Sequence, residues 1–192
     1  MKSILEFARA KHAGRSITVL TAYDAVQARL LAATPVDAIL VGDSAAMAVH
    51  GFDTTIHATV EMMRLHTAAV RRGAPEHFVI ADLPFLATRQ GRKVAVNAAG
   101  ALLQAGANAV KVEGLTGHAD VLVHLIAAGI PVMGHLGLTP QAVHQLGGHR
   151  MQADRPAAAK RLLADAAELE RLGVFALVLE CIPAALAAQV TA

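Results

Sequence analysis

The sequence has few of the residues on which several classes of protein depend. It contains one cysteine, Cys181, so no internal disulfide can form, and we expect a reducing, cytoplasmic location. Charged residues make up only 17% of the 192 positions and give a net charge of +2, while hydrophobic residues make up 55%. This balance excludes a disordered chain. With aromatic residues at 3% and no tryptophan, we expect no nucleic-acid partner.

Long hydrophobic runs are absent as well. The richest segment, residues 119–133, is interrupted by charged and polar residues, a glycine and a proline. A membrane span needs about 18 or more consecutive apolar residues, so we expect no membrane partner. The first residues contain no apolar stretch or cleavage site of the kind that directs export. The length predicts a single domain, residues 1–192.

Six short apolar segments are the candidate strands. They do not alternate with polar residues, which is typical of strands covered on both faces in a parallel sheet. Between them lie stretches rich in Ala, Leu and Arg that are typical of helices, and this alternation predicts an α/β fold. The expected strands are residues 17–20, 38–41, 78–81, 109–112, 131–133 and 176–179. The expected helices are residues 25–33, 60–72, 93–105, 119–128 and 156–172.

Turn residues mark several of the expected helix ends. A glycine follows four of the helices and is predicted to take a left-handed conformation there, at Gly73, Gly106, Gly129 and Gly173. Asp154 precedes the last of these helices at the position expected of an N-cap.

Reactive side chains are predicted to follow nearly every strand. In a (β/α)₈ TIM barrel all strand carboxyl ends converge on one mouth, whereas in an open sheet they lie along a line. We therefore predict a TIM barrel. Six βα units are present where a complete barrel has eight, so the barrel is expected to be truncated after about six units. The strand-end residues are Asp24, Asp43, Ser44, Asp82, Glu113, His135 and Glu180.

Three of these acids, Asp43, Asp82 and Glu113, end neighbouring strands. Strands lie about 5 Å apart, so the carboxylates are within reach of one ion. Oxygen ligands without paired Cys or His favour Mg²⁺ over zinc. The alternative is that each acid caps the helix that follows it. Lys111, within the fourth strand, is expected to face either a bound anion or one of the acids.

Two further strand-end residues have candidate roles. Glu180 is expected to be partly desolvated, which would raise its pKa and make it a proton acceptor near neutral pH. The alternative is an ion pair with Lys111 or Arg150. His135 either donates to a ligand oxygen or holds the next loop. A hydrolase with Ser44 as nucleophile is a weaker hypothesis, because no Asp has a His three residues later.

Seven segments, in order, resemble the ketopantoate hydroxymethyltransferase family. The resemblance runs from about residue 17 to residue 188, and the fifth and seventh segments are the most specific to the family. The segments are TVLTAYD (18–24), LVGDS (40–44), ADLPF (81–85), VKVEG (110–114), PVMGHLGLTPQ (131–141), HQLGG (144–148) and LECIP (179–183).

The resemblance implies a fold and an activity. The fold is a TIM barrel of the phosphoenolpyruvate/pyruvate type. The reaction transfers a hydroxymethyl group from 5,10-methylenetetrahydrofolate to 3-methyl-2-oxobutanoate and gives ketopantoate for pantothenate biosynthesis, with one Mg²⁺ per subunit and a metal-stabilised enolate. The partners implied are the 2-oxo acid, the folate and further copies of the chain, since the family assembles as decamers.

The resemblance also implies roles for individual residues. The metal positions of the family match Asp43, Asp82 and Glu113. Its contacts with the oxo acid match Asp43, Ser44, Asp82 and Lys111, and His135 lines the site. Glu180 matches the proton acceptor.

The sequence departs from the family in two places. The loop at residues 86–92 lacks an expected aromatic residue, and the family continues through two further βα units beyond the LECIP segment. Two alternatives therefore stay open. One is a truncated, non-catalytic remnant of the enzyme. The other is a related metal-dependent 2-oxo-acid lyase, although Cys181 does not lie in the catalytic loop typical of that branch.

Overall fold

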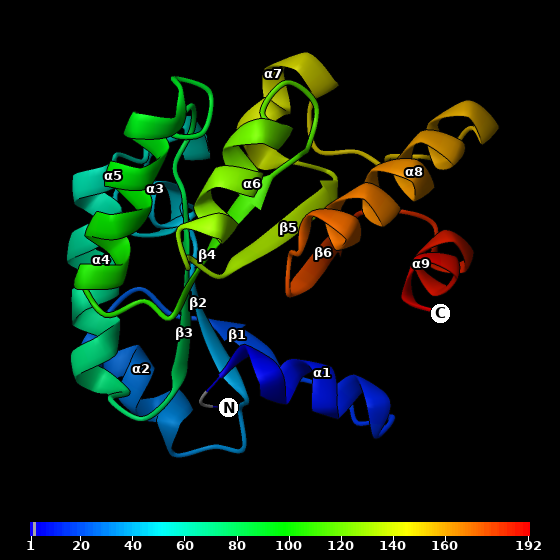
Figure 1. Ribbon diagram of the computed structural model, residues 1–192. Coiled ribbons are helices and arrows are strands. Elements are labelled where there is room, and N and C mark those ends of the chain that lie inside the picture. Colours follow the sequence, from blue (N-terminus) through cyan, green and yellow to red (C-terminus); the bar gives the residue numbers. More distant parts are fainter. Residues whose placement is uncertain (2) are drawn as a thin grey trace.

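Six parallel strands form one curled sheet in the computed structural model, which describes residue 1 and residues 3–192. Each strand pairs with the next one along the chain, so the spatial order is β1-β2-β3-β4-β5-β6. This order is that of a TIM barrel, because a doubly wound sheet reverses direction at its switch point. The predicted barrel architecture is therefore confirmed (Figure 1). The strands are β1 (Val19–Thr21), β2 (Ala38–Val41), β3 (Phe78–Asp82), β4 (Ala109–Glu113), β5 (Val132–Gly137) and β6 (Ala176–Glu180).

The long helices between the strands lie on the convex side of the sheet, whereas the first helix lies across one end of it (Figure 1). The five helices predicted from the sequence are confirmed to within one residue at each end: α2 (Ala25–Ala32), α4 (Val60–Gly73), α5 (Arg92–Gln104), α6 (Ala119–Ala127) and α8 (Pro156–Leu172). The last helix is α9 (Ala184–Thr191). The unpredicted elements are α1 (Ile4–His12), α3 (Ala45–Ala48), α7 (Val143–Leu146) and the 3₁₀ turns η1 (Thr55–His57) and η2 (Pro140–Ala142). No helix in the described part of the chain has the length and hydropathy of a membrane span.

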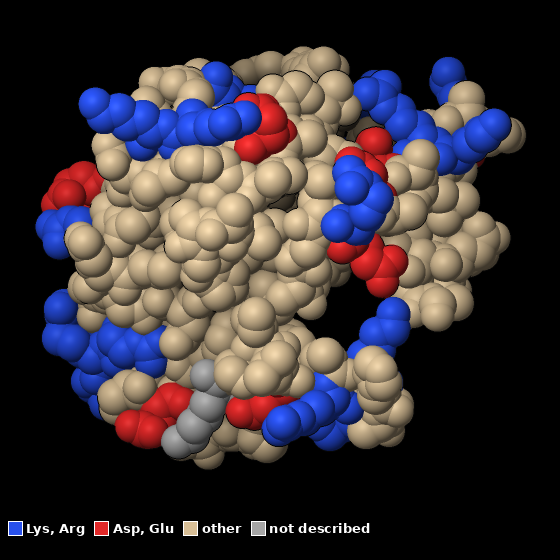
Figure 2. Space-filling view, in the orientation of Figure 1, with Lys and Arg blue, Asp and Glu red and all other residues tan. Residues whose placement is uncertain are grey.

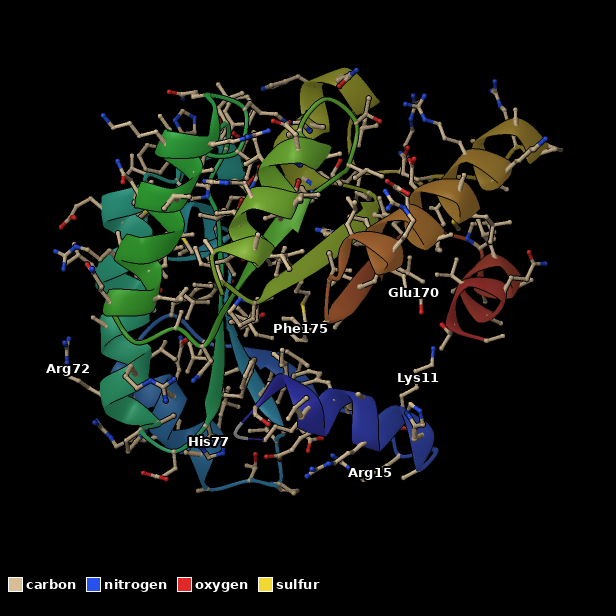
Figure 3. All side chains as sticks on the ribbon, viewed as in Figure 1. Lys11, Arg15, Arg72, His77, Glu170 and Phe175 are labelled. Carbon is tan, nitrogen blue, oxygen red and sulfur yellow. The ribbon has the colours of Figure 1, made fainter. Side chains whose placement is uncertain are left out.

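Helix α1 closes the amino-terminal end of the curled sheet. Its Phe7 packs edge-to-face against Phe78 at 5.2 Å and against Phe175 at 5.1 Å between ring centroids. Figure 3 labels Phe175 between β6 and α1. Ile80 and Met133 point into the same buried cluster from β3 and β5. The concave face is therefore filled with side chains at this end, as in a barrel, and the chemistry is confined to the opposite end.

Three expectations about the ends of helices need correction. Asp154 is not the N-cap of α8, since Arg155 holds that position without a side-chain cap bond. Asp24 does not belong to the site, because its carboxylate caps α2 by accepting from the backbone N–H groups of Val26 and Gln27. Gly73 is the last helical residue of α4 and not a left-handed C-cap. A Cβ there would lie 2.4 Å from the Ala25 carbonyl oxygen, so this glycine allows α4 to pack closely on α2.

The two outer strands of the sheet are less covered than the four between them. β1 is exposed along its length and β6 is half-buried, whereas β3 and β4 are fully buried. Within the described residues, β1 and β6 each have one strand neighbour. The sheet thus contains six of the eight strands of a complete barrel. Figure 2 shows the molecule hollowed between α1 and the side formed by α8 and α9.

An ion pair beside β1 makes the stability of the fold dependent on pH. Asp37 accepts from Thr18 N at 2.9 Å and from Arg15 Nη1 at 3.0 Å, and these bonds lower its pKa below the ordinary value of 3.8. The stabilisation is present above the ordinary pKa and is lost as pH falls through the lowered one. We expect Asp37→Asn to cost about 0.5–1 kcal/mol at neutral pH and almost nothing in strong acid. Urea unfolding of both proteins across this range measures the difference, and a constant difference would contradict the assignment.

Candidate active site

The strand register brings the predicted site residues to one end of the sheet. Asp82 pairs with Lys111 across β3 and β4, and Glu113 pairs with His135 across β4 and β5. Glu180 is the register partner of Gly137, at the ends of β6 and β5. Because alternate residues of a strand face the same side, Lys111 and Glu113 both point into the mouth. The predicted residues from separate strands therefore converge.

Asp43, Asp82 and Lys111 form a buried charged cluster. Their exposed fractions are 3%, 2% and 8%. Asp82 Oδ2 accepts from the backbone N–H of Asp43 at 3.1 Å and lies 3.1 Å from Lys111 Nζ. Burial, and next the charge of Asp82, raises the pKa of Asp43 to about 8. Burial opposes the charge of Lys111, but the surrounding carboxylates outweigh it, led by Asp82, and the pKa of Lys111 is raised. The lysine therefore stays charged and offsets the acids.

His135 lies between two carboxylates on the other side of the mouth. It is fully buried, with Nδ1 3.6 Å from Glu113 Oε1 and Nε2 3.2 Å from Glu180 Oε2, although neither nitrogen has a hydrogen-bond partner among the described residues. Burial opposes protonation, but the interactions with Glu113 and Glu180 outweigh it, so the pKa of His135 is raised. Protonation of His135 is therefore easier in this position than in water.

The expectation that desolvation raises the pKa of Glu180 is wrong. The side chain is 42% exposed, and its interaction with His135 lowers its pKa below the ordinary value of 4.5. Its partner is thus His135, and neither Lys111 nor Arg150 forms the ion pair considered from the sequence. Glu180 is ionised at neutral pH and able to accept a proton.

Gln141 is a site residue to which the sequence analysis assigned no role. It belongs to η2, which begins three residues after the last residue of β5. Its side-chain Nε2 donates to Asp43 Oδ2 at 2.7 Å and to the Leu83 carbonyl at 2.9 Å. Its backbone N–H donates to Glu113 Oε2 at 3.0 Å. Gln141 and Asp43 are 98 positions apart, and no local pattern predicts such a contact.

Ser44 is held at the edge of the site by the only tyrosine in the chain. The Tyr23 hydroxyl and Ser44 Oγ are 2.8 Å apart, in a partly buried hydrogen bond. Ser44 lies at the N-cap of the short helix α3, directly after Asp43. This hydrogen bond holds the hydroxyl group of Ser44 in a defined position beside Asp43.

Asp43 and Asp82 fit a hard divalent cation. Asp82 Oδ1 is buried without a hydrogen-bond partner among the described residues, and burial, together with the charge of Asp82, raises the pKa of Asp43. Adjacent carboxylates in this state are stabilised by a cation, and Mg²⁺ takes one or two carboxylates together with substrate oxygens. In the described part of the chain, however, no three His, Cys, Asp or Glu side chains lie close enough to form a metal site together. Glu113 is instead held by Gln141 N and lies beside His135.

A cavity of about 1050 Å³ opens beside the charged cluster. Glu113 and Gln141 line its inner end, and the β5–α8 connection forms one wall with residues such as His144 and Gln145. Arg89 and Arg161 line it further out, where both donate to Thr116. Burial lowers the pKa of Arg89. The cavity thus joins a buried acidic site to a rim that carries positive charge.

Comparison with known proteins identifies the family of the chain. The family model for ketopantoate hydroxymethyltransferase matches residues 2–192. The chain belongs to this family. The 3-methyl-2-oxobutanoate hydroxymethyltransferase of Legionella pneumophila (strain Paris) is 50% identical to this chain over 189 residues. The match covers 98% of this chain and 72% of the relative. That of Bdellovibrio bacteriovorus is 47% identical over 192 residues, covering 100% and 73%.

Solved structures that resemble this member of the ketopantoate hydroxymethyltransferase family have low sequence identity to it. They are therefore evidence for its fold and not for its activity. A 2,3-dimethylmalate lyase of the PEP mutase/isocitrate lyase superfamily matches with a TM-score of 0.71 and 19% identity, and the match covers 99% of this chain and 65% of the lyase. A phosphonopyruvate hydrolase in complex with oxalate and Mg²⁺ matches with a TM-score of 0.67 and 15% identity, covering 93% and 63%. These matches agree with the barrel fold of the chain.

Proposed function

We propose that this protein is a 3-methyl-2-oxobutanoate hydroxymethyltransferase that converts its 2-oxo acid to ketopantoate for pantothenate biosynthesis. The observation that carries the proposal is the convergence of Asp43, Asp82 and Lys111 with Glu180 at one mouth, in a chain of this family. An acidic pair suited to Mg²⁺, a buried cation and an ionised carboxylate are the groups needed to form an enolate from a 2-oxo acid.

Asp43 and Asp82 would hold Mg²⁺ in this reaction, with Glu113 orienting the site from beside Gln141. The bound ion supplies Lewis-acid polarisation of the keto oxygen, which acidifies the C3–H bond of the substrate. Lys111 offsets the negative charge of the substrate carboxylate and of the developing enolate. Ser44, positioned by Tyr23, would donate a hydrogen bond from its hydroxyl group to a substrate oxygen.

Glu180 is the residue that takes the C3 proton. Its lowered pKa keeps it ionised at neutral pH, so no proton has to leave before catalysis. His135 holds the carboxylate in place through the 3.2 Å contact. Because its pKa is lowered, Glu180 is a weaker base than a glutamate whose pKa is raised by burial. The reaction would therefore depend more strongly on the cation to make the C3–H bond acidic.

The cavity is suited to the second substrate, 5,10-methylenetetrahydrofolate. Its volume of about 1050 Å³ is slightly above the roughly 300–1,000 Å³ typical of ligand pockets and far exceeds the needs of a five-carbon acid. Its inner end reaches Glu113, where a methylene group would meet the enolate, and Arg89 and Arg161 supply positive charge for the carboxylates of the folate.

Exchange of the C3 hydrogen tests the first half of the reaction. The protein is incubated with 3-methyl-2-oxobutanoate and Mg²⁺ in D₂O without folate, and the C3 proton is followed by NMR. We expect exchange that is abolished by EDTA and restored by added Mg²⁺, with Mg²⁺ alone and heat-denatured protein as controls. Subsequent addition of methylenetetrahydrofolate should give ketopantoate. A folded protein that shows no exchange would contradict the proposal and favour the non-catalytic alternative.

A further inference from the structure

We infer that Gln141 is a positioning residue that presents Asp43 to the divalent cation and holds Glu113 beside the cation site. This inference rests on the proposed function, because it assigns a role in binding the same ion. Gln141 is the only described residue that donates hydrogen bonds to both acids, one from its side chain at 2.7 Å and one from its backbone at 3.0 Å.

The geometry gives the Gln141 side chain a single orientation. Its amide nitrogen has two N–H groups, and the two acceptors, Asp43 Oδ2 and the Leu83 carbonyl, use both of them. Leu83 directly follows Asp82, so the amide is anchored to the strand end that carries the second acid. The side chain therefore fixes one oxygen of Asp43 relative to Asp82 and leaves the other carboxylate oxygen for a ligand.

The backbone of Gln141 fixes the third acid. Its N–H group belongs to η2, the turn that begins with Pro140. It donates a hydrogen bond to Glu113 Oε2 at the end of β4. A substitution of the side chain leaves this bond in place. The side-chain and backbone contributions of the same residue can therefore be separated by experiment.

Gln141 also joins the acids to the cavity. It lines the cavity together with Thr139, Ala142 and Gln145 of the same connection. A ligand that shifts this segment would move the hydrogen bonds to Asp43 and Glu113 with it. Outer partners of metal-binding side chains typically change metal affinity by 10–100-fold when they are removed, which is large enough to measure at this position.

Gln141→Met is the test, because it keeps the length of the side chain and removes both N–H donors. Gln145→Met is the matched control, since Gln145 lines the same cavity and makes none of these hydrogen bonds. Mg²⁺ binding is measured by isothermal titration calorimetry on the protein without substrate, and the shift in melting temperature with Mg²⁺ is measured in parallel. We expect Gln141→Met to bind Mg²⁺ about tenfold or more weakly and to lose most of the Mg²⁺-dependent shift, while Gln145→Met behaves as the parent does.

Two further readouts separate positioning from a general structural role. Gln141→Asn, which retains the amide but is one methylene shorter, should recover less than half of the lost Mg²⁺ affinity, because its donors do not reach Asp43. With saturating Mg²⁺, C3 exchange by Gln141→Met should return towards the parent rate. Unchanged or tighter Mg²⁺ binding by folded Gln141→Met would overturn the inference and leave the proposed function intact. A parent protein that does not bind Mg²⁺ would overturn both.

Discussion

Glu180→Gln is expected to slow C3 exchange of 3-methyl-2-oxobutanoate by about 10²–10⁴-fold, the range over which a positioned general base contributes. The substitution keeps the shape of the side chain and removes the group that accepts the proton. Its effect on folding should be small, because Glu180 is 42% exposed and its partner His135 retains Glu113. Exchange followed by NMR in D₂O, with saturating Mg²⁺, measures the effect.

Glu170→Gln is the matched control for this variant, since it makes the same change at an exposed position near the end of α8, labelled in Figure 3. It should exchange at the parent rate. The pH dependence gives a second check. Because the pKa of Glu180 is lowered, the ionised base persists until pH falls below 4.5, so exchange should not decline through Glu180 in mildly acidic solution. Equal exchange by Glu180→Gln and the parent would show that another group takes the proton.

Lys111→Met should destabilise the protein by about 3 kcal/mol when Mg²⁺ is absent, because removing one partner of a buried ion pair leaves the other charge uncompensated. Lys111 lies 3.1 Å from Asp82, and both side chains are almost fully buried. Methionine fills a similar volume, so the loss reflects charge and not a cavity. Urea unfolding of the parent and the variant measures the difference.

Added Mg²⁺ should restore part of the stability of Lys111→Met, because a divalent cation offsets the same carboxylates that the lysine neutralises. Even with Mg²⁺ added, the variant should bind the oxo acid more weakly than the parent, because it lacks the lysine ammonium group that faces the substrate carboxylate. Lys160→Met, on the exposed surface of α8, is the control and should change stability by less than about 0.5 kcal/mol. A loss for Lys111→Met as small as that of Lys160→Met would mean that the acids do not depend on the lysine.

The elements with strong local signals were predictable from the sequence. The long helices α4 and α8 have an apolar face, and the strands β2, β3 and β4 are short apolar runs, so their positions follow from residue periodicity and composition. Helix α1 was missed because its apolar residues fill the end of a barrel, and Phe7 finds its partners on β3 and just before β6. Such packing leaves no local signal.

The sequence likewise predicted some features of the candidate site and not others. The position of a polar residue directly after an apolar strand indicated that Asp82, Glu113 and Glu180 would meet, because parallel strands end at one edge. The protonation behaviour of Glu180 could not be predicted, since its pKa depends on how His135 is placed between β4 and β6. The side-chain hydrogen bond from Gln141 to Asp43 likewise depends on where the β5–α8 connection crosses the mouth.

For this protein, the positions of most strands and of the five long helices between them, and the identity of most reactive residues, follow from the chain itself, because they depend on neighbours within a few residues and on motifs shared with a family. The pairing of those residues does not. Lys111 with Asp82, His135 with Glu180 and Gln141 with Asp43 are contacts between separate strands and loops. Curling of the sheet sets their distances and burial, and these in turn set which groups carry charge.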